Sequence, residues 1–323
     1  MLTNISAIDG RYFEKTRILE AYFSEHALFK YRVKVEILYF LQLIKTGIVQ
    51  IDLDKKLEQD LNSIYENYSI ADSQRIKEFE SQTKHDIKAV EYFIKEKLGS
   101  IGLSRHLEFV HFGLTSQDIN NTALPLMIKD ASQLVLIPFV EALQKELLQL
   151  IAKIGHLPML ARTRGQPASP TTLGKEIRVF AERIEIQLNR FKEIEFSGKF
   201  GGATGNLNAH KVAYPDLNWP VWCEKFLIEK LGISRQKTTT QIAHYDEIAE
   251  WCHQLIRMNT ILLDFCKDIW TYISMEYFKQ RIKEGEIGSS AMPHKVNPID
   301  FENAEGNLSL SNAILGYLAE KLP

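Results

Sequence analysis

The feature that most constrains the fold is a long stretch without glycine or proline, residues 246–279. Apolar residues recur in it every seven positions, in two series: Ile248, Leu255, Leu262 and Ile269, then Trp251, Met258, Phe265 and Tyr272. This spacing predicts one helix roughly 50 Å long. Other apolar residues lie outside both series, so neighbours must cover more than one side of the helix. The sequence therefore predicts an all-α fold, a bundle of long helices that several subunits could share.

Further helices are expected from apolar spacing and end signals over 24–45, 73–97, 172–196 and 115–154. Pro125 and Pro138 should kink or break the last of these. A change of composition near 103–112 predicts two domains, an N-terminal helical domain over 1–110 and a central long-helix bundle domain over 111–323.

Composition narrows the class of protein. The net charge of -2 argues against binding nucleic acid through the whole surface, but it allows a local cationic pocket for a small anion. Three cysteines show no paired or metal-binding spacing and are expected to be buried free thiols: Cys223, Cys252 and Cys266. We see neither a signal peptide nor an apolar stretch approaching roughly 20 residues, so we expect a cytoplasmic protein that does not cross a membrane.

One glycine- and serine-rich segment, residues 285–298, has the composition of a functional loop. Its polar centre holds Ser289, Ser290 and Lys295, and prolines bracket its second half. Such a loop could close over a ligand, but it could equally be a solvated connector between helices. Composition alone leaves both interpretations open.

Residues 288–298, Gly-Ser-Ser-Ala-Met-Pro-His-Lys-Val-Asn-Pro, match every fixed position of the pattern G-S-S-x-M-P-x-K-x-N-P. This pattern resembles the signature loop of the fumarase, aspartase and argininosuccinate lyase superfamily. His294, at a variable position of this pattern, resembles the histidine of adenylosuccinate lyases, and residues 9–12 and the Gln241 region resemble the bacterial type of that enzyme. Residues 83–92 and 112–121 also resemble adenylosuccinate lyases, so the resemblance runs from about residue 9 to the end of the chain.

The resemblance implies an all-α enzyme that eliminates fumarate from succinylated purine nucleotides. Adenylosuccinate would give AMP, and the succinylated aminoimidazole carboxamide ribotide would give its free carboxamide. It also implies that neither a metal nor an organic cofactor is needed. The expected assembly is a homotetramer in which each active site takes segments from three subunits.

The resemblance also implies roles for individual residues. Ser289 would be the general base, and Lys295 and Asn297 would stabilise the negative charge that develops. His85 would be an auxiliary donor. Substrate binding is expected at Arg11, Tyr12, Lys84, His85, Asp86, Thr115, Ser116 and Gln241. Thr115 and Ser116 could equally be simple helix caps, and a lone histidine such as His85 is more often structural.

Two departures from the family pattern weigh against full activity. Residues 162–170 match R-T-H-G-Q-x-A-x-P except that Arg164 stands where the family has its general-acid histidine. Arginine cannot release a proton near neutral pH, so a proton would have to come from elsewhere, for example from His85 or a water. The second departure is length, because the family's C-terminal domain, with arginines that bind phosphate, is expected to be absent from this chain. The alternatives are another lyase of the superfamily, such as argininosuccinate lyase, or a catalytically silent, oligomeric nucleotide-binding or structural protein.

Overall fold

The computed structural model describes residues 2–280 and 296–323, and it confirms the predicted all-α class. The α-helices are α1 Phe13–Thr16, α2 Glu20–Phe23, α3 Glu25–Lys45, α4 Lys55–Glu66, α5 Ile70–Thr83, α6 Asp86–Ser100, α7 Ser116–Ala131, α8 Ile137–Ile154, α9 Leu173–Lys192, α10 Asn208–Ala213, α11 Trp219–Phe226, α12 Asp246–Ser274 and α13 Ile299–Lys321. Short 3₁₀ segments are Arg17–Leu19 and Ser104–Phe109, and π-helical segments are Ser132–Leu136 and Leu227–Leu231. The strands are β1 Pro158–Thr163, β2 Gln166–Thr172, β3 Ser197–Gly198 and β4 Ser234–Arg235.

The chain forms two compact units. Unit 1 comprises Met1–Leu136 and Glu195–His244, and unit 2 comprises Ile137–Ile194 and Tyr245–Pro323. Each unit is thus built from two separate stretches of the chain. The domain boundary expected between residues 110 and 111 stays a prediction.

Unit 1 is organised around α3, which begins at the predicted place because the Ser24 hydroxyl accepts a hydrogen bond from the Ala27 amide. Most of α3 is buried against α4, α5, α6 and α7. At its centre Tyr39 packs edge-on against Phe200, Trp222 and Phe226. This aromatic cluster attaches the chain after residue 195 to a helix near the N-terminus.

His210 is a fully buried polar member of this cluster. The Tyr39 hydroxyl donates to the Phe112 carbonyl oxygen at 2.7 Å and lies 2.9 Å from His210 Nε2. Burial lowers the pKa of His210 to about 4, so the ring is neutral at neutral pH. The Tyr39 hydroxyl uses its only proton in the hydrogen bond to the Phe112 carbonyl. In the second hydrogen bond, Nε2 of His210 is therefore the donor and the Tyr39 oxygen is the acceptor.

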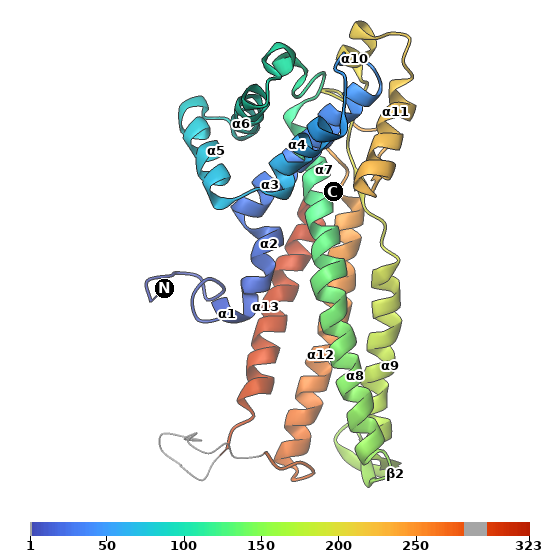
Figure 1. Cartoon of the computed structure of the whole chain (residues 1–323). Coiled ribbons are helices and arrows are strands. Elements are labelled where there is room, and N and C mark those ends of the chain that lie inside the picture. The colour runs from blue at the N-terminus through green and yellow to red at the C-terminus, as the bar shows by residue number, and fades with distance from the viewer. Residues whose placement is uncertain (1, 281–295) are drawn as a thin grey trace. The chain divides into compact units, whose positions relative to one another are not determined.

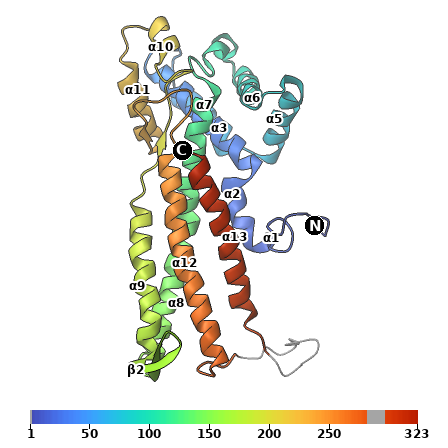
Figure 2. The same ribbon diagram turned by 180° about the vertical axis from the view of Figure 1, so that it is seen from behind.

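Unit 2 consists mainly of four long helices that run side by side, α8, α9, α12 and α13 (Figures 1 and 2). The predicted seven-residue series on α12 is used for packing: Phe265 meets Phe180 of α9, and Trp251 meets Phe191 of α9. A different side of α12, including Cys252, packs on Leu315 of α13. The prediction that two sides of this helix are covered is confirmed, and all three cysteines are buried and free.

The prediction of a single helix over 73–97 is wrong. Helix α5 begins earlier, at Ile70, because Ser69 and Asp72 form a capping box. It ends at Thr83, since Lys84 takes a left-handed conformation with φ of 55° and His85 is extended. The following helix α6 starts at Asp86 with the His85 ring as its cap. The break places Lys84, His85 and Asp86 at a helix start instead of inside a helix.

The predicted effect of the two prolines in 115–154 is only partly observed. Helix α7 continues through Pro125, which removes the amide that would bond to the Asn121 carbonyl. The Lys199 amide donates to that carbonyl instead, at 3.4 Å. A π-helical segment, Ser132–Leu136, ends two residues before Pro138, which is the second residue of α8.

Among the described residues, the helix spanning Ser116–Ile154 is long and apolar enough to cross a membrane by length and composition alone. Its most apolar window is 44% buried inside the protein, and a core helix passes the same test. The expectation that the protein does not cross a membrane stays a prediction.

We predict that Gly113→Ala destabilises the protein more than Gly102→Ala. Both glycines have positive φ, +68° and +85°, so each alanine costs about 1–2 kcal/mol in the backbone. A Cβ at Gly113 would also lie 2.7 Å from the His210 ring, whereas one at Gly102 meets nothing within 4 Å. The clash should add about 1–3 kcal/mol, measured by chemical denaturation. Equal losses in the two variants would contradict this packing argument.

Candidate active site

The N-terminus of α7 is the best-defined part of the candidate site. Thr115 is the cap residue, and its amide donates to Asp118 Oδ2 at 2.8 Å. Ser116 is the first residue of the helix. Amides at a helix start point away from the helix and favour an anion. The predicted capping role of Thr115 is therefore observed, and it leaves the binding role open.

A buried cluster, Asp118 with Lys199, Gly201 and Gly202, fixes this helix start. The side chains of Asp118 and Lys199 are both fully buried, and Lys199 Nζ donates to Asp118 Oδ1 at 2.7 Å. The amide of Gly201 also donates to Asp118 Oδ1, at 2.8 Å, and that of Gly202 donates to Oδ2 at 3.0 Å. One carboxylate thus joins α7 to the glycine-rich loop between β3 and α10, residues 199–207. We call these four residues the Asp118 cluster.

The start of α6 carries three of the predicted binding residues. The Lys88 amide donates to His85 Nδ1 at 3.3 Å, so Nδ1 is an acceptor and the proton of the neutral ring is on Nε2. Asp86 Oδ1 accepts a hydrogen bond from the Ile87 amide at 2.8 Å. Both His85 and Lys84 are exposed. His85 therefore presents an imidazole N–H donor at this helix start.

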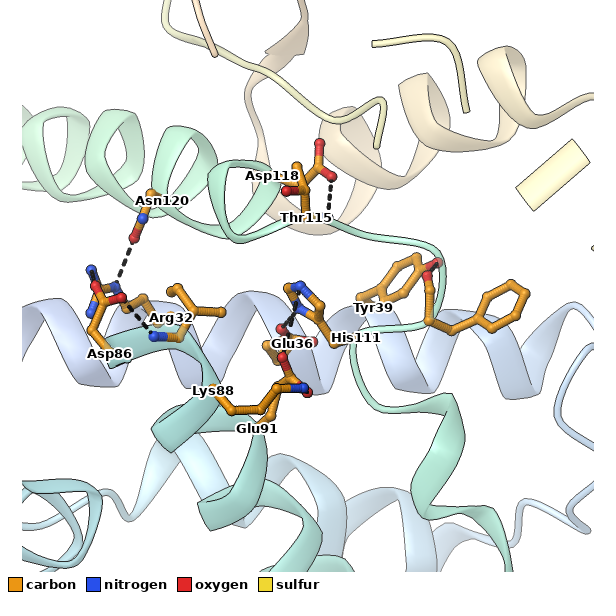
Figure 3. Close-up of polar contacts among 12 residues, drawn as sticks. Arg32, Glu36, Tyr39, Asp86, Lys88, Glu91, His111, Thr115, Asp118 and Asn120 are labelled. Carbon is orange, nitrogen blue, oxygen red and sulfur yellow. Dashed lines mark hydrogen bonds and ion pairs between the residues drawn. The ribbon is translucent and has the colours of Figure 1, made fainter. Parts of the chain in front are cut away.

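Arg32 of α3 connects the two helix starts, as Figure 3 shows. Its Nη2 donates to Asp86 Oδ2 at 2.7 Å, and its Nε donates to Asn120 Oδ1 on α7 at 2.9 Å. The Arg32 side chain is 7% exposed and that of Asp86 is 41% exposed. The structure thus brings the residues predicted on α6 and on α7 to one region of unit 1.

Gln241 belongs to a segment that is attached to the same part of α7. Two residues after it, the Ala243 amide donates to Asn121 Oδ1 at 2.7 Å. Asn121 is buried, whereas Gln241 itself is exposed. The predicted binding residue therefore lies on exposed chain next to a buried anchor.

Arg11 and Tyr12 are not brought to this region. Tyr12 precedes the short helix α1, and Arg11 is exposed. In Figures 1 and 2 the α1 segment lies apart from the α6 helix. Within this one chain, the structure does not group these two residues with the others.

The remaining predicted residues belong to unit 2 or lie outside the described part of the chain. Arg164 and Gly165 both have positive φ, 53° and 78°, and form the two-residue turn of a hairpin in which Thr163 pairs with Gln166. Sequence reasoning missed this β1–β2 hairpin. Asn297 lies just before α13. Ser289 and Lys295 fall outside the described residues.

A second charged group, not predicted from the sequence, lies beside the start of α7. His111 Nδ1 is 2.5 Å from Glu36 Oε1, and Glu91 pairs with Lys88 at 2.6 Å (Figure 3). Burial acts to lower the pKa of His111, but the charges of Glu36 and Glu91, with the hydrogen bond to Glu36, outweigh it and raise the pKa. Arg32 and Glu36 could have been noticed as charges inside the apolar helix 24–45, since buried charges need partners.

Comparison with known proteins identifies the family. Residues 10–313 match the Lyase family. Over the whole chain, 53% of residues are identical to the adenylosuccinate lyase of Dictyostelium discoideum, 47% to that of Vibrio cholerae and 46% to that of Escherichia coli K12. The chain belongs to the adenylosuccinate lyase family. It spans 71% of the length of each of these relatives.

Solved structures share the fold. The 3-carboxy-cis,cis-muconate lactonizing enzyme of Pseudomonas putida has a TM-score of 0.76 at 22% identity, over 95% of this chain and 66% of its own. The fumarate lyase of Mesorhizobium sp. BNC1 has a TM-score of 0.73 at 20% identity, over 95% and 65%. These two support the fold alone, and the link to adenylosuccinate lyases depends on the sequence relatives.

The described residues contain no group of three or more histidine, cysteine, aspartate or glutamate side chains placed to hold a metal ion. The expectation that this member of the family works without a metal or organic cofactor stays a prediction.

We predict that Asp118→Asn destabilises the protein by about 3–5 kcal/mol, because it leaves the buried Lys199 cation without its counter-charge. Adding Lys199→Met should recover part of the loss. The matched control is Glu108→Gln, which removes the exposed partner of Lys95 at 3.2 Å and should change the free energy of unfolding by less than about 1 kcal/mol. Equal effects of Asp118→Asn and Glu108→Gln would contradict the anchoring role of the Asp118 cluster.

Proposed function

We propose that this chain eliminates fumarate from adenylosuccinate, giving AMP, and from the succinylated aminoimidazole carboxamide ribotide, two steps of purine nucleotide biosynthesis. The observation that carries the proposal is identity of 46–53% over the full chain to adenylosuccinate lyases of three organisms. The convergence of the α6 and α7 starts in unit 1 supports it, because both present polar groups suited to an anionic substrate.

Ser289 is the proposed base. It takes a proton from the carbon beside a carboxylate of the succinyl group, and the electron pair left on that carbon becomes part of the new double bond. The intermediate carries extra negative charge, which Lys295 and Asn297 stabilise by charge and hydrogen bonding. A serine needs such neighbours to act as a base, since its ordinary hydroxyl holds its proton tightly.

The carbon–nitrogen bond then breaks, and the departing nitrogen needs a proton. Arg164 cannot supply it, because a guanidinium stays charged near neutral pH. His85 is the proposed alternative donor, acting as its imidazolium, which becomes the neutral ring when it gives its proton to the departing nitrogen. Arg164 would contribute only charge and hydrogen bonds.

Substrate anions are proposed to bind at the two helix starts. The α7 start offers the Ser116 amide and the hydroxyls of Thr115 and Ser116, and Lys84 offers a cation at the α6 start. Asp86 and Gln241 supply hydrogen-bonding side chains. Arg11 and Tyr12 lie apart from these residues within one chain, which suits sites shared between subunits.

Self-association is the remaining part of the proposal. Large apolar side chains are exposed along the helices of unit 2, on α8, α9 and α13: Phe139, Leu148, Val179, Ile186, Leu310, Ile314 and Tyr317. Apolar surface of this kind is typical of a protein–protein interface. We propose a homotetramer with active sites shared among subunits, in the cytoplasm.

We predict that Arg164→His raises kcat for fumarate release by roughly 10²- to 10⁴-fold, since it supplies a general acid. Histidine tolerates the positive φ found at this position, so the hairpin should be retained. Arg164→Gln, which has no titratable proton, is the control and should leave the rate low. Equal rates for the starting chain and Arg164→His would mean that position 164 does not limit turnover.

A catalytically silent nucleotide-binding protein is the second candidate, and Arg164 is the residue that favours it. The same measurement separates the two. Binding of adenylosuccinate without turnover in the starting chain and in Arg164→His would support the silent scaffold.

We predict that Ser289→Ala, made in the faster Arg164→His background, lowers kcat by at least about 10²-fold because the base is lost. Substrate binding, measured by calorimetry, should persist. Ser290→Ala is the matched control, as it removes the neighbouring hydroxyl and should have a smaller effect. Unchanged fumarate release by Ser289→Ala would refute the proposed base.

A further inference from the structure

We propose that Arg32 is a positioning residue: it sets the spacing between the N-terminal ends of α6 and α7 and so holds the two substrate-binding segments in register. The identity of the substrate rests on the proposed function. The positioning itself rests on the geometry around the guanidinium group.

The guanidinium of Arg32 reaches one acceptor on each helix. Nη2 donates to Asp86 Oδ2, in the first turn of α6, at 2.7 Å. Nε donates to Asn120 Oδ1 at 2.9 Å, and Asn120 lies four residues, about one turn, after Ser116 on α7. Because the group is planar and its donors are fixed relative to one another, the two acceptors are held at a defined separation.

The burial of Arg32 indicates that its charge does more than fill space within α3. Its side chain is 7% exposed on a helix whose neighbouring residues are mostly apolar and buried. A buried charge is costly, and an apolar residue of similar size would pack at this position without that cost. What the arginine adds is a directional bond to two different helices at once.

Asp86 is the residue through which this positioning reaches the candidate site. One carboxylate oxygen of Asp86 accepts a hydrogen bond from Arg32, and the other accepts one from the Ile87 amide at 2.8 Å. The Asp86 side chain is still 41% exposed. His85 Nδ1 lies 3.6 Å from Asp86 Oδ1. Movement of Asp86 would therefore displace the start of α6 together with the proposed donor His85.

The test compares Arg32→Lys with the parent chain. A lysine offers one ammonium on a flexible stem, so it cannot hold both acceptors in the same geometry. We expect KM for adenylosuccinate to rise about tenfold, because the groups proposed to bind the substrate are no longer held in place. We expect kcat to fall as well, because the proposed donor His85 is displaced with them. We also expect amide hydrogen exchange in the first turns of both α6 and α7 to rise about tenfold.

Arg75→Lys is the matched control. Arg75 also bridges two places in unit 1, donating to Glu96 at 2.6 Å and to Glu78 at 2.5 Å, but its side chain is 41% exposed and it touches neither α7 nor Asp86. The control should leave KM and the exchange at both helix starts within about twofold of the parent. An effect of Arg32→Lys no larger than that of Arg75→Lys would overturn the proposal.

The exchange measurement separates this proposal from the proposed function. If the parent chain and Arg164→His release no fumarate, the proposed function fails, yet faster exchange at both helix starts in Arg32→Lys would still support positioning. If Arg32→Lys does not fold, Asn120→Ala replaces it, since that variant removes only the acceptor on α7. Asn120→Ala should speed exchange at the start of α7, and unchanged exchange there would overturn the proposal.

Discussion

Unit 1 depends on a carboxylate that is completely removed from water. Asp118 receives the ammonium of Lys199 and the amides of Thr115, Gly201 and Gly202. An isolated buried carboxylate would be very costly, and these donors offset that cost. The consequence is geometric, because all of them meet at one side chain. The start of α7 and the glycine-rich loop, far apart in the sequence, are therefore held together.

The other polar groups of unit 1 extend the same principle from one helix to the next. Arg32 joins α3 to the starts of α6 and α7, and His111 joins Glu36 of α3 to the chain just before α7. Hydrophobic packing is not directional, so it brings these helices together without setting which turn faces which. The buried polar pairs specify that register. The groups proposed to bind substrate lie at the helix starts that these pairs hold.

Several features follow directly from residue pattern. The seven-residue series after residue 246 is enough to predict α12, since an apolar seam at that spacing can be buried only as a helix. The caps Ser24 and Thr172 mark the beginnings of α3 and α9, because their hydroxyls satisfy otherwise unpaired amides. The break at Lys84 was missed, since an exposed lysine in a left-handed conformation has no distinctive sequence signal. The β1–β2 hairpin was missed for a similar reason, as its turn uses Arg164 where asparagine or aspartate is commoner.

The sequence by itself determined the all-α class, the long packed helices and the family, because periodicity and motif residues are local properties of the chain. It also determined the conflict at Arg164, since the inability of a guanidinium to release a proton does not depend on the fold. Only the tertiary structure decided that Asp118 meets Lys199 and that Arg32 meets both Asp86 and Asn120. Such partners lie tens of residues apart, and no local pattern in one sequence states which charge will be buried against which.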